Sequence, residues 1–159
     1  MKSILDQNEL YSIAARFRIA IEKALNAGEF SSDSIFQCFP RGCCGFTSDL
    51  LAKYLREFGV ETQYMSGNYE YGWEGRSHAW LETYDGVVID ITRDQFKNDP
   101  EPLHCEQEVY VGIEDEICKL FEQQALCPEY QEDVKPAWMG ETQTEKIFCK
   151  RYGVITKYL

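Results

Sequence analysis

Apolar residues recur at helical spacing in two segments near the start of the chain. Gly28 follows the first segment and Gly59 the second, each in the place of a C-terminal stop. We therefore predict an amphipathic helix over residues 5–27 and a buried helix that follows the turn-like residues 40–45. The positions that define the two helices are Leu10, Ile13, Ala14, Phe17, Ala20, Ile21, Ala24 and Leu25 in the first, and Phe46, Leu50, Leu51, Tyr54, Leu55 and Phe58 in the second.

Alternating apolar and polar residues follow the second helix and indicate strands. The alternation predicts strands over residues 60–66, 77–84 and 87–92, with one more over 108–112. The glycine- and aromatic-rich residues 67–75 are predicted to form a mobile loop close to the site, and residues 94–102 a crossing loop. Apolar spacing predicts a helix over 113–126, residues 129–141 have the composition of a loop, and the tail 142–159 is interpreted as a helix running into a strand.

The length of the hairpin loop after residue 83 decides whether His78 and Asp90 can meet. A two-residue loop would place them on opposite faces of the sheet. A three-residue loop, residues 84–86 with Gly86 in the left-handed conformation, pairs Thr83 with Val87 and brings Asp90 diagonally next to His78. We predict the three-residue loop, because it makes one face entirely apolar. That face carries Ala79, Leu81, Val87, Ile89 and Ile91, and the other carries His78, Trp80, Glu82, Val88 and Asp90.

Together these elements predict one α+β domain over residues 1–159. An antiparallel sheet of about four or five strands would pack against the second helix, with the N-terminal helix and C-terminal helices around it. A chain of 159 residues with 14% aromatic side chains is long enough to form such a core.

Charge and cysteine content narrow the function classes. The chain has 16 basic and 27 acidic residues, and a net charge of −11 disfavours binding to nucleic acid or to an anionic membrane surface. No apolar run has the length of a signal peptide or of a membrane span, for which about 20 residues are needed. Seven cysteines without a regular framework are typical of a reducing compartment. We therefore expect a cytoplasmic protein.

Cys44 is a candidate nucleophile because it lies where the second helix begins. Unpaired backbone N–H groups and the helix dipole favour the thiolate at that position. The alternative is that Cys44 only packs, since cysteine is also a small apolar residue. His78 and Asp90 complete a possible triad, in which His78 would accept and return the thiol proton while Asp90 would orient the imidazole and stabilise its cation.

Three ordered motifs over about residues 40–96 resemble the transglutaminase-like branch of the papain-like cysteine enzymes. The family's nucleophile motif is matched by Gly42, Cys44, Ser48, Leu50 and Gly59, and the match is lost if Cys43 is taken instead. Residues 78–82 (His-Ala-Trp-Leu-Glu) match the histidine motif. Residues 90–92 (Asp-Ile-Thr) correspond to Asp-Pro-Thr, with Ile91 in place of proline.

The resemblance implies a papain-like core and a cysteine-dependent acyl transfer at an amide. Cys44 would attack a carboxamide of a peptide or protein substrate, and water or an amine would resolve the thioester, with no metal or organic cofactor. This leaves a peptidase, a deamidase and a transglutaminase open. A catalytically inactive peptide- or protein-binding module of the same fold is the alternative, and a peptidase acting on a modified precursor peptide is a third hypothesis.

Other residues carry weaker hypotheses. Gln37 is either an oxyanion donor, as an upstream glutamine is in papain-like peptidases, or a solvated loop residue, and the backbone N–H of Cys44 could serve instead. Trp73 and Trp80 could both line an acyl site. The alternative for Trp80 is that it packs on the helix. Cys43 is either structural or a redox partner of its neighbour. Zinc is another use for the cysteine and histidine residues, but adjacent ligand pairs suit tetrahedral coordination poorly. The residues in question are Cys43, Cys44, His104 and Cys105.

Overall fold

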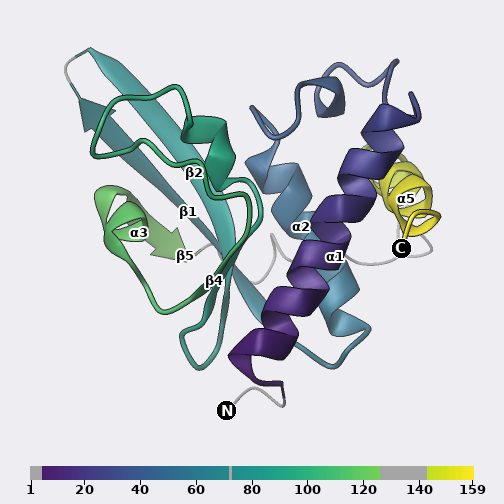
Figure 1. The fold of residues 1–159 in the computed structure, drawn as a ribbon, viewed down its shortest axis with the longest axis horizontal. Coiled ribbons are helices and arrows are strands. Elements are labelled where there is room, and N and C mark those ends of the chain that lie inside the picture. The colour runs from purple at the N-terminus through teal and green to yellow at the C-terminus, as the bar shows by residue number, and fades with distance from the viewer. Residues whose placement is uncertain (1–4, 72, 126–142) are drawn as a thin grey trace.

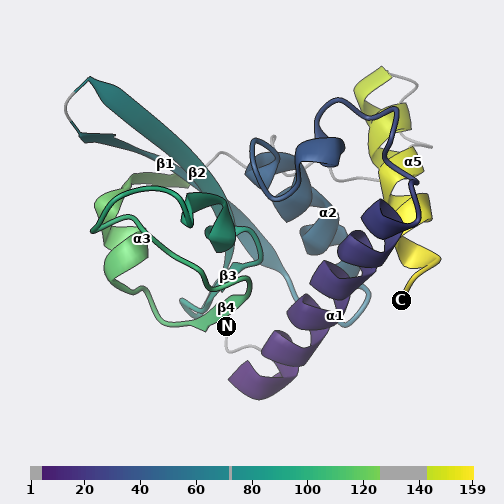
Figure 2. The same cartoon turned by 45° about the horizontal axis from the view of Figure 1, so that its top comes forward.

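The computed structural model describes residues 5–71, 73–125 and 143–159, which form an α+β fold (Figure 1). Within these residues, five strands form one antiparallel sheet in the order β4-β3-β2-β1-β5. Helices α1 and α2 contact the sheet, and α5 packs against both helices on the side away from it (Figures 1 and 2). The strand bounds are β1 Thr62–Tyr71, β2 Glu74–Thr83, β3 Val88–Asp90, β4 Tyr110–Gly112 and β5 Glu122–Ala125. The long helices are α1 Gln7–Asn26, α2 Cys44–Arg56 and α5 Gln143–Thr156, and the short ones are η1 Phe36–Cys38, η2 Arg93–Phe96 and α3 Glu116–Leu120.

Both predicted N-terminal helices are present. A capping box between Asp6 and Glu9 starts α1, and Gly28 follows it with φ +79°. Gly59, with φ +76°, follows α2 in the predicted place. Two aromatic positions differ from the buried helix expected there. Phe46 in the first turn of α2 is 42% exposed, and Phe58, which follows the end of α2, is 39% exposed.

The prediction of a loop over residues 67–75 is wrong, because β1 extends to Tyr71 and β2 begins at Glu74. The two strands remain paired as far as Tyr71 and Glu74. Together they form a long two-stranded arm that projects from the body of the molecule (Figures 1 and 2). The side chain of Trp73 at its tip is fully exposed. The paired backbone hydrogen bonds explain why a glycine-rich segment is a strand here.

Two C-terminal predictions also need correction. The helix expected over 113–126 ends at Leu120, and Glu122–Ala125 instead forms β5, which pairs with β1 at Met65 to Asn68. The strand expected at the end of the tail is absent from residues 143–159, where α5 continues to Thr156. The predicted loop at 129–141 lies outside the described residues.

The hairpin register is confirmed. Leu81 pairs with Ile89, and the N–H of Thr83 donates to the carbonyl of Val87, so the loop contains three residues. Gly86 has φ +90°, as the loop requires. The predicted apolar face, with Leu81 and Ile89, joins the main core beneath α1 and α2. The opposite face is also covered, and Trp80 belongs to a second core there.

No helix within the described part of the chain combines the length and the apolar composition needed to cross a membrane.

Candidate active site

Cys44 is the first residue of α2 and is half-buried. Gly42, with φ +72°, turns the chain into the helix. The first turn lies close to the sheet, because a Cβ atom placed on Gly45 would be 2.6 Å from the hydroxyl of Tyr64 on β1. The thiol of neighbouring Cys43 is buried, and burial raises its pKa to about 12. Of the two adjacent thiols, only Cys44 has a pKa below the usual value.

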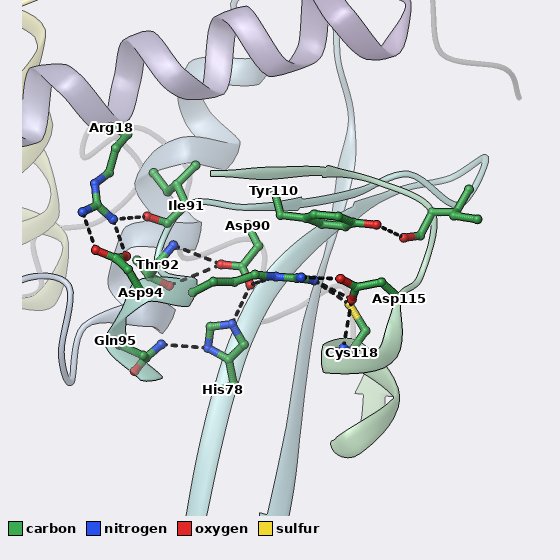
Figure 3. A network of polar contacts seen from close by, with 12 residues as sticks. Arg18, His78, Asp90, Ile91, Thr92, Asp94, Gln95, Tyr110, Asp115 and Cys118 are labelled. Carbon is green, nitrogen blue, oxygen red and sulfur yellow. Dashed lines mark hydrogen bonds and ion pairs between the residues drawn. The ribbon is translucent and has the colours of Figure 1, made fainter. Parts of the chain in front are cut away.

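His78 on β2 and Asp90 at the end of β3 form a buried pair (Figure 3). His78 Nε2 lies 2.6 Å from Asp90 Oδ2, and each residue is 2% exposed. Burial opposes the charged ring, but the charge of Asp90 and its hydrogen bond raise the pKa of His78 to about 9. Burial likewise opposes the carboxylate, yet the charge of His78 and its hydrogen bond lower the pKa of Asp90. The pair therefore favours an ionised carboxylate beside a protonated imidazole.

The thiol of Cys44 interacts with this pair. Burial alone would raise the pKa of Cys44, but a hydrogen bond with His78 and the positive charge of the ring lower it below the usual value of 9.0. The backbone N–H of Ala79 adds a further hydrogen bond that favours the thiolate. The structure thus brings together the three residues that the sequence singled out.

Arg93 in η2 supports Asp90 and was missed by the sequence reasoning. Its Nε atom lies 3.2 Å from Asp90 Oδ2, while its two terminal nitrogens bind the carboxylate of Asp115 at 2.6 and 2.9 Å. The guanidinium lies over the ring of Tyr110, 3.9 Å from its centroid, and is almost completely buried. Asp90 Oδ1 in turn accepts the backbone N–H of Thr92 at 3.0 Å. These contacts fix the orientation of the carboxylate toward His78.

Gln95 is a second residue that the sequence reasoning did not identify. Its Nε2 atom lies 2.9 Å from His78 Nδ1, on the opposite side of the ring from Asp90 (Figure 3). The sequence predicted a crossing loop here and gave no signal for a contact with His78. Only the packing of η2 against β2 reveals it.

Aromatic rings surround the imidazole of His78. Phe96 meets it edge to face with ring centroids 5.0 Å apart, Trp80 is tilted against it at 5.5 Å and Phe121 at 5.6 Å. Trp80 therefore packs beside His78 in the second core, on the sheet face opposite α2, which corrects the alternative that it packs on the helix. The Nε1 atom of Trp80 is buried without a hydrogen-bond partner in the described residues.

Two other candidates from the sequence, Gln37 and Trp73, lie away from this cluster. Gln37 is exposed on η1, and among the described residues its side chain makes no hydrogen bond with Cys44, His78 or Asp90. Trp73 is at the tip of the β1–β2 arm. In the described ranges, no three His, Cys, Asp or Glu side chains are grouped so that they could hold a metal ion.

Comparisons with protein-family models, with curated proteins and with solved structures found no match to this chain.

Proposed function

We propose that the protein is a cysteine-dependent amide hydrolase or acyltransferase. One observation carries the proposal, namely the buried contact of 2.6 Å between His78 and Asp90 beside the thiol of Cys44 at the start of α2. Such an arrangement is the one that activates a thiol nucleophile, because the base is oriented by a third residue and the thiolate is stabilised by its surroundings.

The proposed reaction starts from the thiolate of Cys44 and the imidazolium of His78, a pair that proton transfer from the thiol creates. The S–H bond breaks as Nδ1 of His78 takes the proton, while Nε2 keeps its hydrogen bond to Asp90. The thiolate attacks a carboxamide carbon, and the negative charge moves to the carbonyl oxygen. The backbone N–H of Cys44, at the N-terminus of α2 and without an intrahelical acceptor, is the proposed donor to that oxygen.

Collapse of the intermediate completes the first half of the reaction. The C–N bond breaks, the amine leaves with the proton from Nδ1 of His78, and the acyl group remains on Cys44 as a thioester. Water or a second amine then attacks the thioester carbon as His78 removes its proton. The C–S bond breaks and Cys44 leaves as the thiolate, which gives hydrolysis or transamidation. These steps use only side chains and backbone of the chain.

The motifs and the fold support a transglutaminase-like enzyme with a papain-like core as the specific form of this proposal. A helix that begins at the nucleophile packs on an antiparallel sheet whose adjacent strands carry His78 and Asp90. A peptide or protein substrate in the cytoplasm, neutral or basic rather than a nucleic acid, agrees with the net charge of −11.

Alkylation of the cysteines by iodoacetamide at graded pH, with peptide mapping, tests the proposal. We expect Cys44 to react selectively below pH 8, and His78→Ala or His78→Gln to abolish that selectivity while circular dichroism shows that each variant is folded. His104→Ala is the matched control, because the chain has only two histidines. If wild-type Cys44 reacts no faster than the other cysteines, the catalytic proposal fails and the inactive binding module becomes the better hypothesis.

A further inference from the structure

Both ring nitrogens of His78 have a side-chain partner. Asp90 holds Nε2 at 2.6 Å and Gln95 reaches Nδ1 at 2.9 Å, so the ring is contacted on two sides by β3 and η2 (Figure 3). Nδ1 is also the nitrogen left for the thiol of Cys44, since Nε2 faces the carboxylate. Gln95 therefore contacts the atom that must gain and lose a proton during the proposed reaction.

The two forms of His78 need opposite partners at Nδ1. An ionised Asp90 accepts a hydrogen bond, so the proton of a neutral ring lies on Nε2 and Nδ1 carries a lone pair. The amide N–H of Gln95 can donate to that lone pair. Once Cys44 has given up its proton, Nδ1 carries a hydrogen and requires an acceptor. The carbonyl end of the same amide meets this requirement after half a turn about the last side-chain torsion.

The backbone that carries Gln95 is held in place while its amide is only half-buried. The preceding residue, Asp94, binds Arg18 of α1 through two hydrogen bonds of 2.7 and 2.8 Å. The following residue, Phe96, is buried against His78. The backbone N–H of Gln95 itself donates to the carbonyl of Thr92 at 3.1 Å. A rigid backbone with a rotatable amide suits a group that must stay close to Nδ1 and exchange its ends.

We propose that Gln95 is a positioning residue for His78, which donates its amide N–H to the neutral ring and offers its amide carbonyl to the imidazolium. This inference rests on the proposed function, in which His78 is the base. The Gln95 amide supplies both a donor and an acceptor without a charge, and it already lies within hydrogen-bond distance of Nδ1. Gln95 moves no proton itself, and the S–H bond of Cys44 still exchanges for an N–H bond at Nδ1.

Replacing Gln95 separates the two roles of the amide. Gln95→Glu keeps the shape but offers only an acceptor, so it favours the imidazolium, and we expect it to raise the pKa of His78 by about one unit. Gln95→Met removes donor and acceptor at similar length. It should slow the alkylation of Cys44 at pH 7 about threefold to tenfold, because the ring is then held on one side only. Gln37→Glu, the same change on exposed η1, is the matched control for the added charge.

The titration of His78 is measured by nitrogen-15 NMR in a Cys44→Ala background, which removes the neighbouring thiol from the titration. His104 is the internal reference, as the only other histidine. The proposal requires a larger shift in Gln95→Glu than in Gln37→Glu. It is overturned if the two variants shift His78 equally, or if Gln95→Met alkylates at the wild-type rate. An unreactive wild-type Cys44 would instead refute the proposed function, and the NMR titration would still decide whether Gln95 partners His78.

Discussion

Replacing Asp90 with asparagine should deprive His78 of the negative charge that keeps its ring protonated. The side chain keeps its size, and its amide oxygen can still accept a hydrogen bond from Nε2. The change therefore removes the charge and preserves most of the geometry. Arg93 retains its two contacts with Asp115, which limits the effect on folding.

The structure sets the size of the expected effect. The pKa of His78 is raised from 6.5 to about 9, and this gap corresponds to roughly 3 kcal/mol in favour of the charged ring. Burial opposes the charge and remains in the variant, so we expect the pKa of His78 to fall to 6.5 or below. The pKa of Cys44 should then rise toward or above 9.0, because its two largest stabilising contributions come from His78. A thiol of pKa 9 is about 1% ionised at pH 7, so the alkylation rate should fall by up to about a hundredfold.

The assay compares the alkylation rate of Cys44 in wild type and Asp90→Asn between pH 5.5 and 9. In wild type the reactive thiolate should be present well below pH 8, whereas in the variant it should appear only near pH 9. Glu82→Gln on β2 is the control for the loss of one negative charge. If Asp90→Asn keeps the wild-type pH profile, the ionisation of Cys44 does not depend on the pair of His78 and Asp90, and the electrostatic reasoning is wrong.

Three further predictions concern stability, measured by urea unfolding. Gly45→Ala should lower the free energy of unfolding by about 1–3 kcal/mol, because its Cβ would lie 2.6 Å from the Tyr64 hydroxyl. Adding Tyr64→Phe should recover most of this loss. Equal losses with and without Tyr64→Phe would contradict the clash. Arg151 lowers the pKa of Asp33 from 3.8 to about 2, so their ion pair stabilises the fold above pH 3.8 and this contribution disappears as the pH falls through 2. The advantage of wild type over Asp33→Asn should be about 1 kcal/mol at pH 7, after allowance for solvent screening, and should be almost gone at pH 2; a constant difference would refute the assignment. Arg93→Met should lower the free energy of unfolding by about 3 kcal/mol or more, because it leaves the carboxylates of Asp90 and Asp115 without their shared cation. A loss within about 0.5 kcal/mol, the size expected for a surface substitution, would show that the guanidinium does not stabilise the fold.

The hairpin that carries the candidate base was predictable because every second residue along it is apolar, which makes one face entirely apolar. A period of two makes the two faces distinguishable in sequence, and a single face free of polar residues selected the three-residue loop. The cysteine helix was predictable for a similar reason, since its apolar period ends at a glycine that the structure shows in the left-handed conformation.

The β1–β2 arm and β5 were not predictable from local pattern. In the arm, backbone pairing between two strands overrides the turn preference of a glycine-rich segment, and that pairing is a tertiary property. The segment after Leu120 has the apolar spacing of a helix, but it pairs with the edge of β1 and forms a strand. In both cases the hydrogen bonds come from a neighbouring strand, and the local sequence does not show which strand that is.

The residues that support His78 and Asp90 could not be predicted from the sequence for another reason. Arg93 and Gln95 belong to a four-residue 3₁₀ helix, which is too short to have a period. Their partners Asp115 and His78 are 22 and 17 positions away in the chain. Side chains that act through such distant contacts carry no local signature, and only the folded chain brings them to the imidazole.

The three-residue turn after Thr83 also decides which length changes the pair of His78 and Asp90 tolerates. A slip of one position in the pairing of β3 with β2 would send the carboxylate of Asp90 to the other side of the sheet, away from His78. A turn of another length preserves the facing as long as Thr83 still pairs with Val87, whereas a one-residue insertion or deletion within the strands does not. Homologous sequences that retain this histidine and aspartate should therefore vary in length within the turn and not in the strands beside it.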